Sequence, residues 1–259
     1  MKGISIITTL LLLVSILILP SCNTNSSTQD EMKKPVSTTL ESAAVNTSLE
    51  DQDEEEPGKS SKQGAGYSAG AGSAVSLNME NMQEAYKGET TASAKYAEYG
   101  KKAEQEGYHQ IAMLFKAASL SEMTHANNHR AVLEEAGQVV PQITPSFTVL
   151  STKENLKDAI AGETYEITTM YPRFLANANT VGNQLSLISL NYAYKTEQKH
   201  KPLYEKALVS LNNDTVKSLP SVYYVCPTCG NTYETTAPKR CGISMTGGEK
   251  FVKISSVNS

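Results

Sequence analysis

Two Glu-x-x-His pairs repeat along this chain, and a lone Gly-Glu precedes each of them on an earlier helical stretch. The six residues are Glu89, Glu122 and His125 in the first half, and Glu163, Glu197 and His200 in the second. The interval between the lone glutamate and the pair is nearly the same in both halves (122 − 89 against 197 − 163). A duplicated helix hairpin of this kind brings four carboxylates and two imidazoles together, which is a ligand set that holds two iron or manganese ions in a bundle.

The setting of the pairs decides between a metal centre and ordinary surface charge. A glutamate and a histidine three residues apart lie on one face of a helix, and a single such pair is usually exposed. Here Glu122 and His125 interrupt an apolar stripe that contains Ile111, Phe115 and Ala118. Buried carboxylates are costly unless they are paired or bound to metal. The pattern therefore favours a buried metal centre over two solvated helix faces.

The elements that must position these residues are two matched helix hairpins. The helical pattern runs over 78–137 and breaks at Gly107, and the second half breaks in the same way at Gly182. The interval from each glycine to the glutamate of its pair is identical in the two halves (122 − 107 and 197 − 182). The two hairpins are therefore in register along their whole length.

A long connection separates the hairpins. Gly137, Pro141 and Pro145 end the second helix, and Ser151-x-x-Glu154 has the capping-box pattern that starts a third. We expect the connection, residues 137–151, to cross the end of the bundle. The sequence thus predicts an all-α, ferritin-like four-helix bundle with one long crossover over residues 77–215.

Residues 1–22 have the pattern of an export signal. Lys2 precedes an apolar run at 4–19, which is too short for a typical membrane span. The run ends in Leu-Pro-Ser-Cys, which resembles a bacterial lipobox, so Cys22 would carry the lipid. We expect an exported, membrane-anchored lipoprotein in the periplasm or on the cell surface. An uncleaved anchor, the alternative, would also place the rest of the chain outside the cytoplasm.

Residues 23–76 are predicted to form a disordered tether that is acidic and rich in glycine and serine. Their composition offers little apolar surface to offset the entropy of ordering. The net charge of −4 and the lack of a basic stripe give no reason to expect nucleic acid as a partner.

At the paired motifs the sequence resembles the rubrerythrin family, over residues 77–253, through KGETTASAKYAEYG, SLSEMTH, AGETYEITTMYPRF and KTEQKH. For one iron, the resemblance implies as ligands Glu89, Glu122 and either His125 or Glu166. For the other iron, it implies Glu163, Glu197 and His200. It also implies that Glu122 and Glu197 bridge the ions, and that the first iron exchanges His125 for Glu166 as it is oxidised.

Two tyrosines and a third histidine lie near these motifs. By the resemblance, Tyr96 and Tyr171 stand beside the site. Tyr96 follows Glu89 by two helical turns (96 − 89), so its hydroxyl can donate to a ligand carboxylate. For both tyrosines the alternative is a place in the apolar core. His129 follows His125 by one turn (129 − 125) and is interpreted as a surface residue near the helix end rather than a ligand.

The C-terminal residues 220–256 resemble a small rubredoxin-like β module, or zinc ribbon. Cys226-Pro-Thr-Cys229 is a metal knuckle, and Cys241 lies in the second half, where Ser244 stands in place of a fourth cysteine. Four interpretations stay open: iron with Ser244 as fourth ligand, zinc held by the three cysteines, no metal and a disulfide, or a degenerate ribbon. We favour a metal, iron or zinc, because so small a module has little core without one.

The resemblance implies a function as a non-haem di-iron oxidoreductase that reduces hydrogen peroxide in oxidative stress defence. The catalytic residues would be Glu166, His125, Tyr96 and Tyr171. An unidentified redox protein would donate electrons, and the chain would form a homodimer. Two alternatives remain open: a ferroxidase or other iron-handling bundle, and a non-enzymatic metal-binding lipoprotein.

Overall fold

The computed structural model describes residues 68–257 of the chain. The expected export signal, Cys22 and the tether up to residue 67 lie outside the described residues. Among the described helices, none combines the length and the apolar character that crossing a membrane requires.

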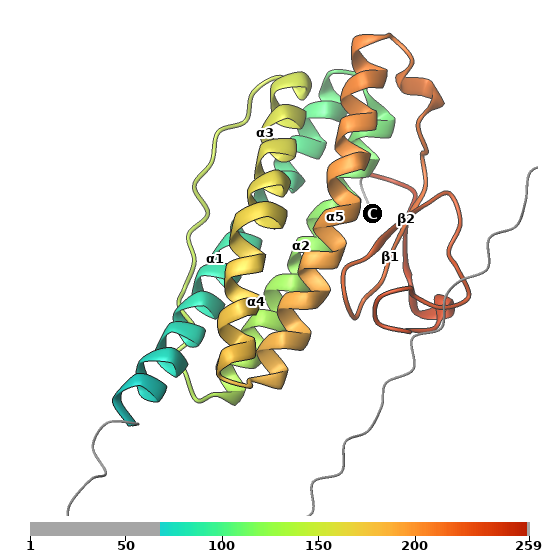
Figure 1. Cartoon of the computed structure of the whole chain (residues 1–259). Coiled ribbons are helices and arrows are strands. Elements are labelled where there is room, and N and C mark those ends of the chain that lie inside the picture. The colour runs from blue at the N-terminus through green and yellow to red at the C-terminus, as the bar shows by residue number, and fades with distance from the viewer. Residues whose placement is uncertain (1–67, 258–259) are drawn as a thin grey trace, which may run out of the picture. The chain divides into compact units, whose positions relative to one another are not determined.

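Four helical rods form the bundle, as predicted (Figure 1). The first two are α1 (Ser68–Gln105) and α2 (His109–Glu135), and the fourth is α5 (Gln184–Asn212). The third is continuous but has three parts: α3 (Thr152–Tyr165), the π-helical segment η1 (Glu166–Met170) and α4 (Tyr171–Thr180). The breaks at Gly107 and Gly182 fall where the sequence predicted them.

Helix α1 begins at Ser68, so the expected start of the bundle at residue 77 is wrong and residues 68–76 are helical. Their glycine and serine content suggested coil, but extending an existing helix costs little once its first turns have formed. The third rod also contacts this end, because Asn177 Nδ2 donates to the Ala74 carbonyl at 3.4 Å.

The connection between the hairpins runs along the bundle rather than across its end, which corrects our expectation (Figure 1). Helix α2 ends at one end of the bundle and α3 begins at the other, so the chain must cover a full helix length. Fifteen extended residues reach about 50 Å at ~3.3 Å each, whereas a helix of about 28 residues is about 40 Å long. At its far end the Ser151 hydroxyl accepts a hydrogen bond from Glu154 N at 3.3 Å, which is the predicted cap.

The π-helical segment ends at Met170, two positions before Pro172. Proline has no N–H, and its ring clashes with the carbonyl four residues earlier in an α-helix. A widened turn relieves this clash, and here Tyr171 N donates to the Glu166 carbonyl five residues back. The segment therefore adds one residue to the turn that follows Glu163.

The C-terminal ribbon is a three-stranded antiparallel sheet in the order β2-β1-β3. Its strands are β1 (Tyr223–Val225), β2 (Thr232–Glu234) and β3 (Val252–Ile254). Tyr223, Val225 and Ile254 are buried in the same apolar cluster as Phe115 of α2. The ribbon thus packs against the bundle of its own chain, beside α2 and α5 (Figure 1).

Candidate metal centre

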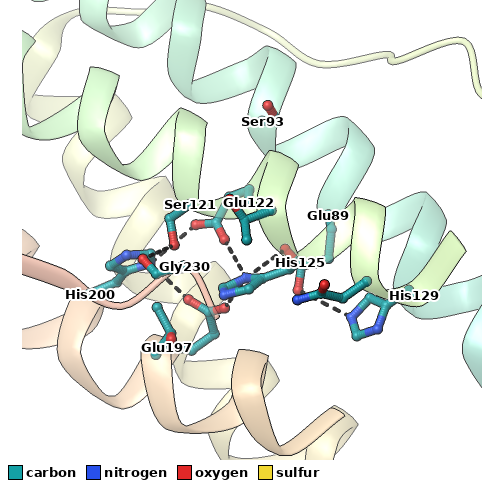
Figure 2. Close-up of polar contacts among 12 residues, drawn as sticks. Glu89, Ser93, Ser121, Glu122, His125, His129, Glu197, His200 and Gly230 are labelled. Atoms are coloured by element: carbon teal, nitrogen blue, oxygen red, sulfur yellow. Dashed lines mark hydrogen bonds and ion pairs between the residues drawn. The ribbon is translucent and has the colours of Figure 1, made fainter. Parts of the chain in front are cut away.

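The structure brings the six glutamates and histidines of the two halves together in the middle of the bundle, with at most 2% of any one exposed. Figure 2 labels each of them except Glu163. They come from all four rods: Glu89 from α1, Glu122 and His125 from α2, Glu163 from α3, and Glu197 and His200 from α5. Their ligand atoms form two groups, each within 4.8 Å: Glu89, Glu122, His125 and Glu197, then Glu122, Glu163, Glu197 and His200. Glu122 and Glu197 belong to both groups. A carboxylate that bridges two ions must contribute to both.

The ligand atoms of the two histidines and of Glu122 and Glu197 approach one another closely but do not form hydrogen bonds with one another. His125 Nδ1 lies 2.9 Å from oxygens of both Glu122 and Glu197. His200 Nδ1 lies 2.8 Å from Glu197 Oε2. Yet both Nδ1 atoms and all four oxygens of Glu122 and Glu197 are buried without a hydrogen-bond partner. Atoms that converge on one point without donor–acceptor alignment fit a shared cation, and this oxygen and imidazole set suits iron or manganese.

Burial opposes charge on these carboxylates. Burial raises the pKa of Glu89 to about 8. The pKa of Glu163 is raised well above its ordinary value by burial and by the neighbouring Glu197 and Glu122. Burial lowers the pKa of His200, but the Glu122 and Glu197 carboxylates outweigh it and raise that pKa to about 10. Without a cation the site therefore retains protons, and a metal that binds there must displace them.

The two tyrosines connect the hairpins. Tyr96 on α1 donates to Glu163 Oε1 at 3.1 Å, and Tyr171 on α4 donates to Glu89 Oε1. Each hydroxyl therefore reaches the carboxylate of the opposite hairpin and fixes its orientation. Both rings are also buried, so donation and core packing occur together.

Glu166 lies close to the site but belongs to neither ligand group. It is partly exposed and opens the π-helical segment. Burial, followed by the charges of Glu89 and Glu197, raises its pKa well above the ordinary value. The exchange between Glu166 and His125 stays a prediction, and His125 is the one that points into the group.

The prediction that His129 lies on the surface is wrong, because its side chain is fully buried. Its Nδ1 lies 2.7 Å from Ser189 Oγ and its Nε2 3.3 Å from the Tyr171 hydroxyl. Burial, and then the nearby His125, lower its pKa to about 3, so the ring is neutral. Its spacing of one helical turn from His125 was the one signal that placed it on the same helix face.

The ribbon closes the outer side of both ligand histidines. His125 Nε2 donates to the Cys229 carbonyl at 3.1 Å, and His200 Nε2 lies 3.1 Å from the Thr232 hydroxyl. That hydroxyl donates to the Gly230 carbonyl, so it accepts from His200. With the proton held at Nε2, the lone pair of each Nδ1 faces the carboxylates, as metal binding requires.

The thiols of Cys226, Cys229 and Cys241 form a second candidate metal site, with their sulfur atoms within 4.8 Å of one another. All three are free, and Cys229 Sγ and Cys241 Sγ are 3.4 Å apart, which is no disulfide. Ser244 Oγ lies 3.3 Å from Cys226 Sγ and takes the place of a fourth thiol. The set fits a four-coordinate zinc or iron.

The comparisons with known proteins point to one family. The rubrerythrin family profile matches residues 80–208. Rubrerythrin-2 of Clostridium acetobutylicum is 32% identical over 179 residues, which cover 68% of this chain and 95% of that protein. Nigerythrin of Nitratidesulfovibrio vulgaris is 31% identical over 69% of this chain and 87% of that protein.

The solved structures agree with this. A fully reduced, all-ferrous nigerythrin structure has a TM-score of 0.62 at 29% identity, covering 68% of this chain and 86% of that one. A bacterioferritin of Desulfovibrio desulfuricans, at 19% identity and a TM-score of 0.52, covers 56% of this chain and 85% of that one, and it shows the fold alone.

Proposed function

This chain belongs to the rubrerythrin family, and from that premise we propose that it is an oxidoreductase that reduces hydrogen peroxide at a di-iron centre. The observation that carries the proposal is the pair of overlapping ligand groups with Glu122 and Glu197 in common. Bridging carboxylates hold two ions close enough to act on one small substrate.

Each residue of the site has a role in the proposal. Glu89 and His125 would hold one ion, and Glu163 and His200 the other, with the shared carboxylates between them. When bound, two ferrous ions supply the two electrons that convert hydrogen peroxide and two protons into two waters. Burial and the ribbon exclude bulk water from the centre.

Tyr96 and Tyr171 keep Glu163 and Glu89 in position by hydrogen bonds. Glu166 would hold the first ion in place of His125 when the centre is oxidised. Its position at the start of the π-helical segment supports this role, because such segments often occur at functional sites.

We also propose that the ribbon holds one iron or zinc through Cys226, Cys229, Cys241 and Ser244. With iron, the ribbon would pass electrons to the bundle from an unidentified redox protein. The Cys229 carbonyl supports this role, because it accepts the hydrogen bond of His125 and so joins the two sites directly. The proposal also includes export, lipidation at Cys22, anchoring to a membrane and formation of a homodimer.

The test uses the full-length chain purified without oxygen. We expect about two irons in the bundle. We also expect a hydrogen peroxide pulse to oxidise the reduced centre faster than oxygen does, measured by stopped-flow absorbance. A reduced centre that oxygen oxidises at least as fast as peroxide would contradict the proposal. Continued turnover of excess ferrous iron without a protein reductant would instead indicate a ferroxidase.

A further inference from the structure

A chain of buried polar groups leads from the metal centre to the surface of the bundle. Tyr171 donates to Glu89, His129 Nε2 lies 3.3 Å from the Tyr171 hydroxyl, and His129 Nδ1 lies 2.7 Å from Ser189 Oγ. Figure 2 shows His129 at the Glu89 end of the cluster, opposite His200. Ser189 in turn lines a surface pocket of about 420 Å³ that is formed by residues of α2 and α5.

The hydrogen bonds along this series of polar groups all run in one direction. In the metal-loaded centre Glu89 is ionised and can only accept, so the Tyr171 hydroxyl donates to it and must itself accept from His129 Nε2–H. The neutral ring then offers Nδ1 as an acceptor to the Ser189 hydroxyl. Every donor therefore points from the pocket toward the metal centre.

The duplicated fold provides an internal comparison. One constant offset in residue number relates Tyr96 to Tyr171 (171 − 96), His129 to Tyr204 (204 − 129) and Leu114 to Ser189 (189 − 114). In the other half, Tyr96 also donates to a carboxylate, that of Glu163. Its neighbours Tyr204 and Leu114 lie in the apolar cluster, and the Tyr204 hydroxyl is buried without a partner. The polar chain is therefore a property of one half and not a consequence of the fold.

We propose that Ser189, His129 and Tyr171 relay protons from the surface pocket to Glu89 during peroxide reduction. The relay rests on the proposed function, because each hydrogen peroxide that gains two electrons also takes up two protons to form two waters. A buried centre closed by the ribbon needs a route for those protons.

One transfer along the relay is balanced at every atom. A proton from solvent bonds to Ser189 Oγ as the hydroxyl proton passes to His129 Nδ1. The Nε2 proton passes to the Tyr171 oxygen as the phenol proton passes to Glu89 Oε1. The three relay groups gain and lose one proton each and keep their charge. Glu89 then gives up this proton to a water that forms from the peroxide. Before a second transfer, the two hydroxyls rotate, and His129 loses its Nδ1 proton and regains one at Nε2.

The test measures single-turnover oxidation of the reduced, iron-loaded full-length protein by hydrogen peroxide, in H₂O and in D₂O. We expect Ser189→Ala to slow oxidation on the order of 100-fold, as loss of a positioned proton-transfer group typically does. We expect Ser189→Thr, which keeps a hydroxyl, to restore the rate. The matched control is Ser93→Ala, because Ser93 is likewise 4% exposed but donates to the Ser119 carbonyl, away from the relay.

A second variant covers the case in which Ser189→Ala fails to fold. His129→Gln keeps a polar side chain but cannot transfer a proton between two nitrogens, and we expect it to slow oxidation with iron content unchanged. Wild-type rates and solvent isotope effects in Ser189→Ala and His129→Gln would overturn the relay alone. A wild-type centre that does not react with peroxide would overturn the proposed function as well.

An independent readout needs no turnover. In the zinc-loaded, diamagnetic protein, ¹⁵N NMR should show His129 protonated at Nε2, with Nδ1 accepting a hydrogen bond. Ser189→Ala should shift the Nδ1 resonance, and Ser93→Ala should leave it unchanged. Protonation of His129 at Nδ1 in the wild type would reverse the direction of the chain and overturn the relay.

Discussion

At the scale of single residues, the carboxylates of the site differ in how many ions each can hold. Glu122 and Glu197 belong to both ligand groups, whereas Glu89 and Glu163 belong to one each. Removing the charge of a shared carboxylate therefore weakens the binding of both ions, and it also removes one of the two carboxylates that both His125 and His200 contact. Removing an unshared carboxylate leaves one group intact.

This difference predicts the metal content of two variants. Glu197→Gln should lose nearly all bundle metal, whereas Glu163→Gln should keep about one of two ions. The measurement is metal content per chain after anaerobic reconstitution, with circular dichroism to confirm that both variants keep their helices. Equal losses from the two variants would show that Glu197 does not bridge.

At the scale of elements, the repeat in the sequence predicted the four rods, their breaks and the six converging ligands. It did not predict the π-helical segment. The interval from Glu163 to Tyr171 (171 − 163) is one position longer than the interval from Glu89 to Tyr96 (96 − 89). The widened turn before Pro172 absorbs the extra residue, so both hydroxyls still reach a carboxylate. A bulge of this kind depends on one local carbonyl clash, which helical periodicity does not reveal.

The sequence also did not predict how the ribbon packs against the bundle. Its hydrogen bonds to α2 are accepted by the backbone carbonyls of Cys229 and Gly230, and any residue type carries a carbonyl. The burial of His129 was missed for a related reason. His129 is not part of the repeat, because Tyr204 stands at the matching position of the second half, and its partner Ser189 lies on another helix.

The contact of the ribbon knuckle with α2 can be tested at Gly230. Its φ is +77°, and a Cβ there would lie 2.6 Å from Ser121 Oγ and closer still to His125 Nε2. Gly230→Ala should therefore cost several kcal/mol, from about 1–2 for the backbone conformation and about 1–3 for overpacking. It should also weaken metal binding by displacing His125. Urea denaturation and metal titration measure the two effects.

Gly137→Ala is the matched control for Gly230→Ala. Gly137 also has a positive φ, +65°, but nothing lies within 4 Å of a Cβ built on it. Its substitution should cost only the backbone term, about 1–2 kcal/mol, and should leave metal affinity unchanged. If the two variants are equally destabilised and bind metal equally well, the ribbon does not press on His125 in solution.

At the scale of the whole molecule, the metal centre links stability to pH. Without metal, folded Glu89 has its pKa raised by burial to about 8, so it keeps a proton that the unfolded chain releases near pH 4.5. His200, whose pKa is raised to about 10 despite burial, keeps a proton that the unfolded chain releases near pH 6.5. Both groups make the folded state bind more protons than the unfolded state above about pH 5.

The free energy of unfolding of the metal-free protein should therefore fall as pH rises from about 5 to 9, by ~1.4 kcal/mol per pH unit for each extra proton bound. In the metal-loaded protein the ions replace those protons, so the decline should disappear, and metal affinity should increase with pH because the ligands must be deprotonated. Urea denaturation across this pH range, with and without chelator, measures both. Glu89→Gln should make the metal-free decline shallower, since an amide does not titrate. A metal-free protein that becomes more stable toward high pH would mean that its carboxylates are already ionised, and that the bundle tolerates their charge without a cation.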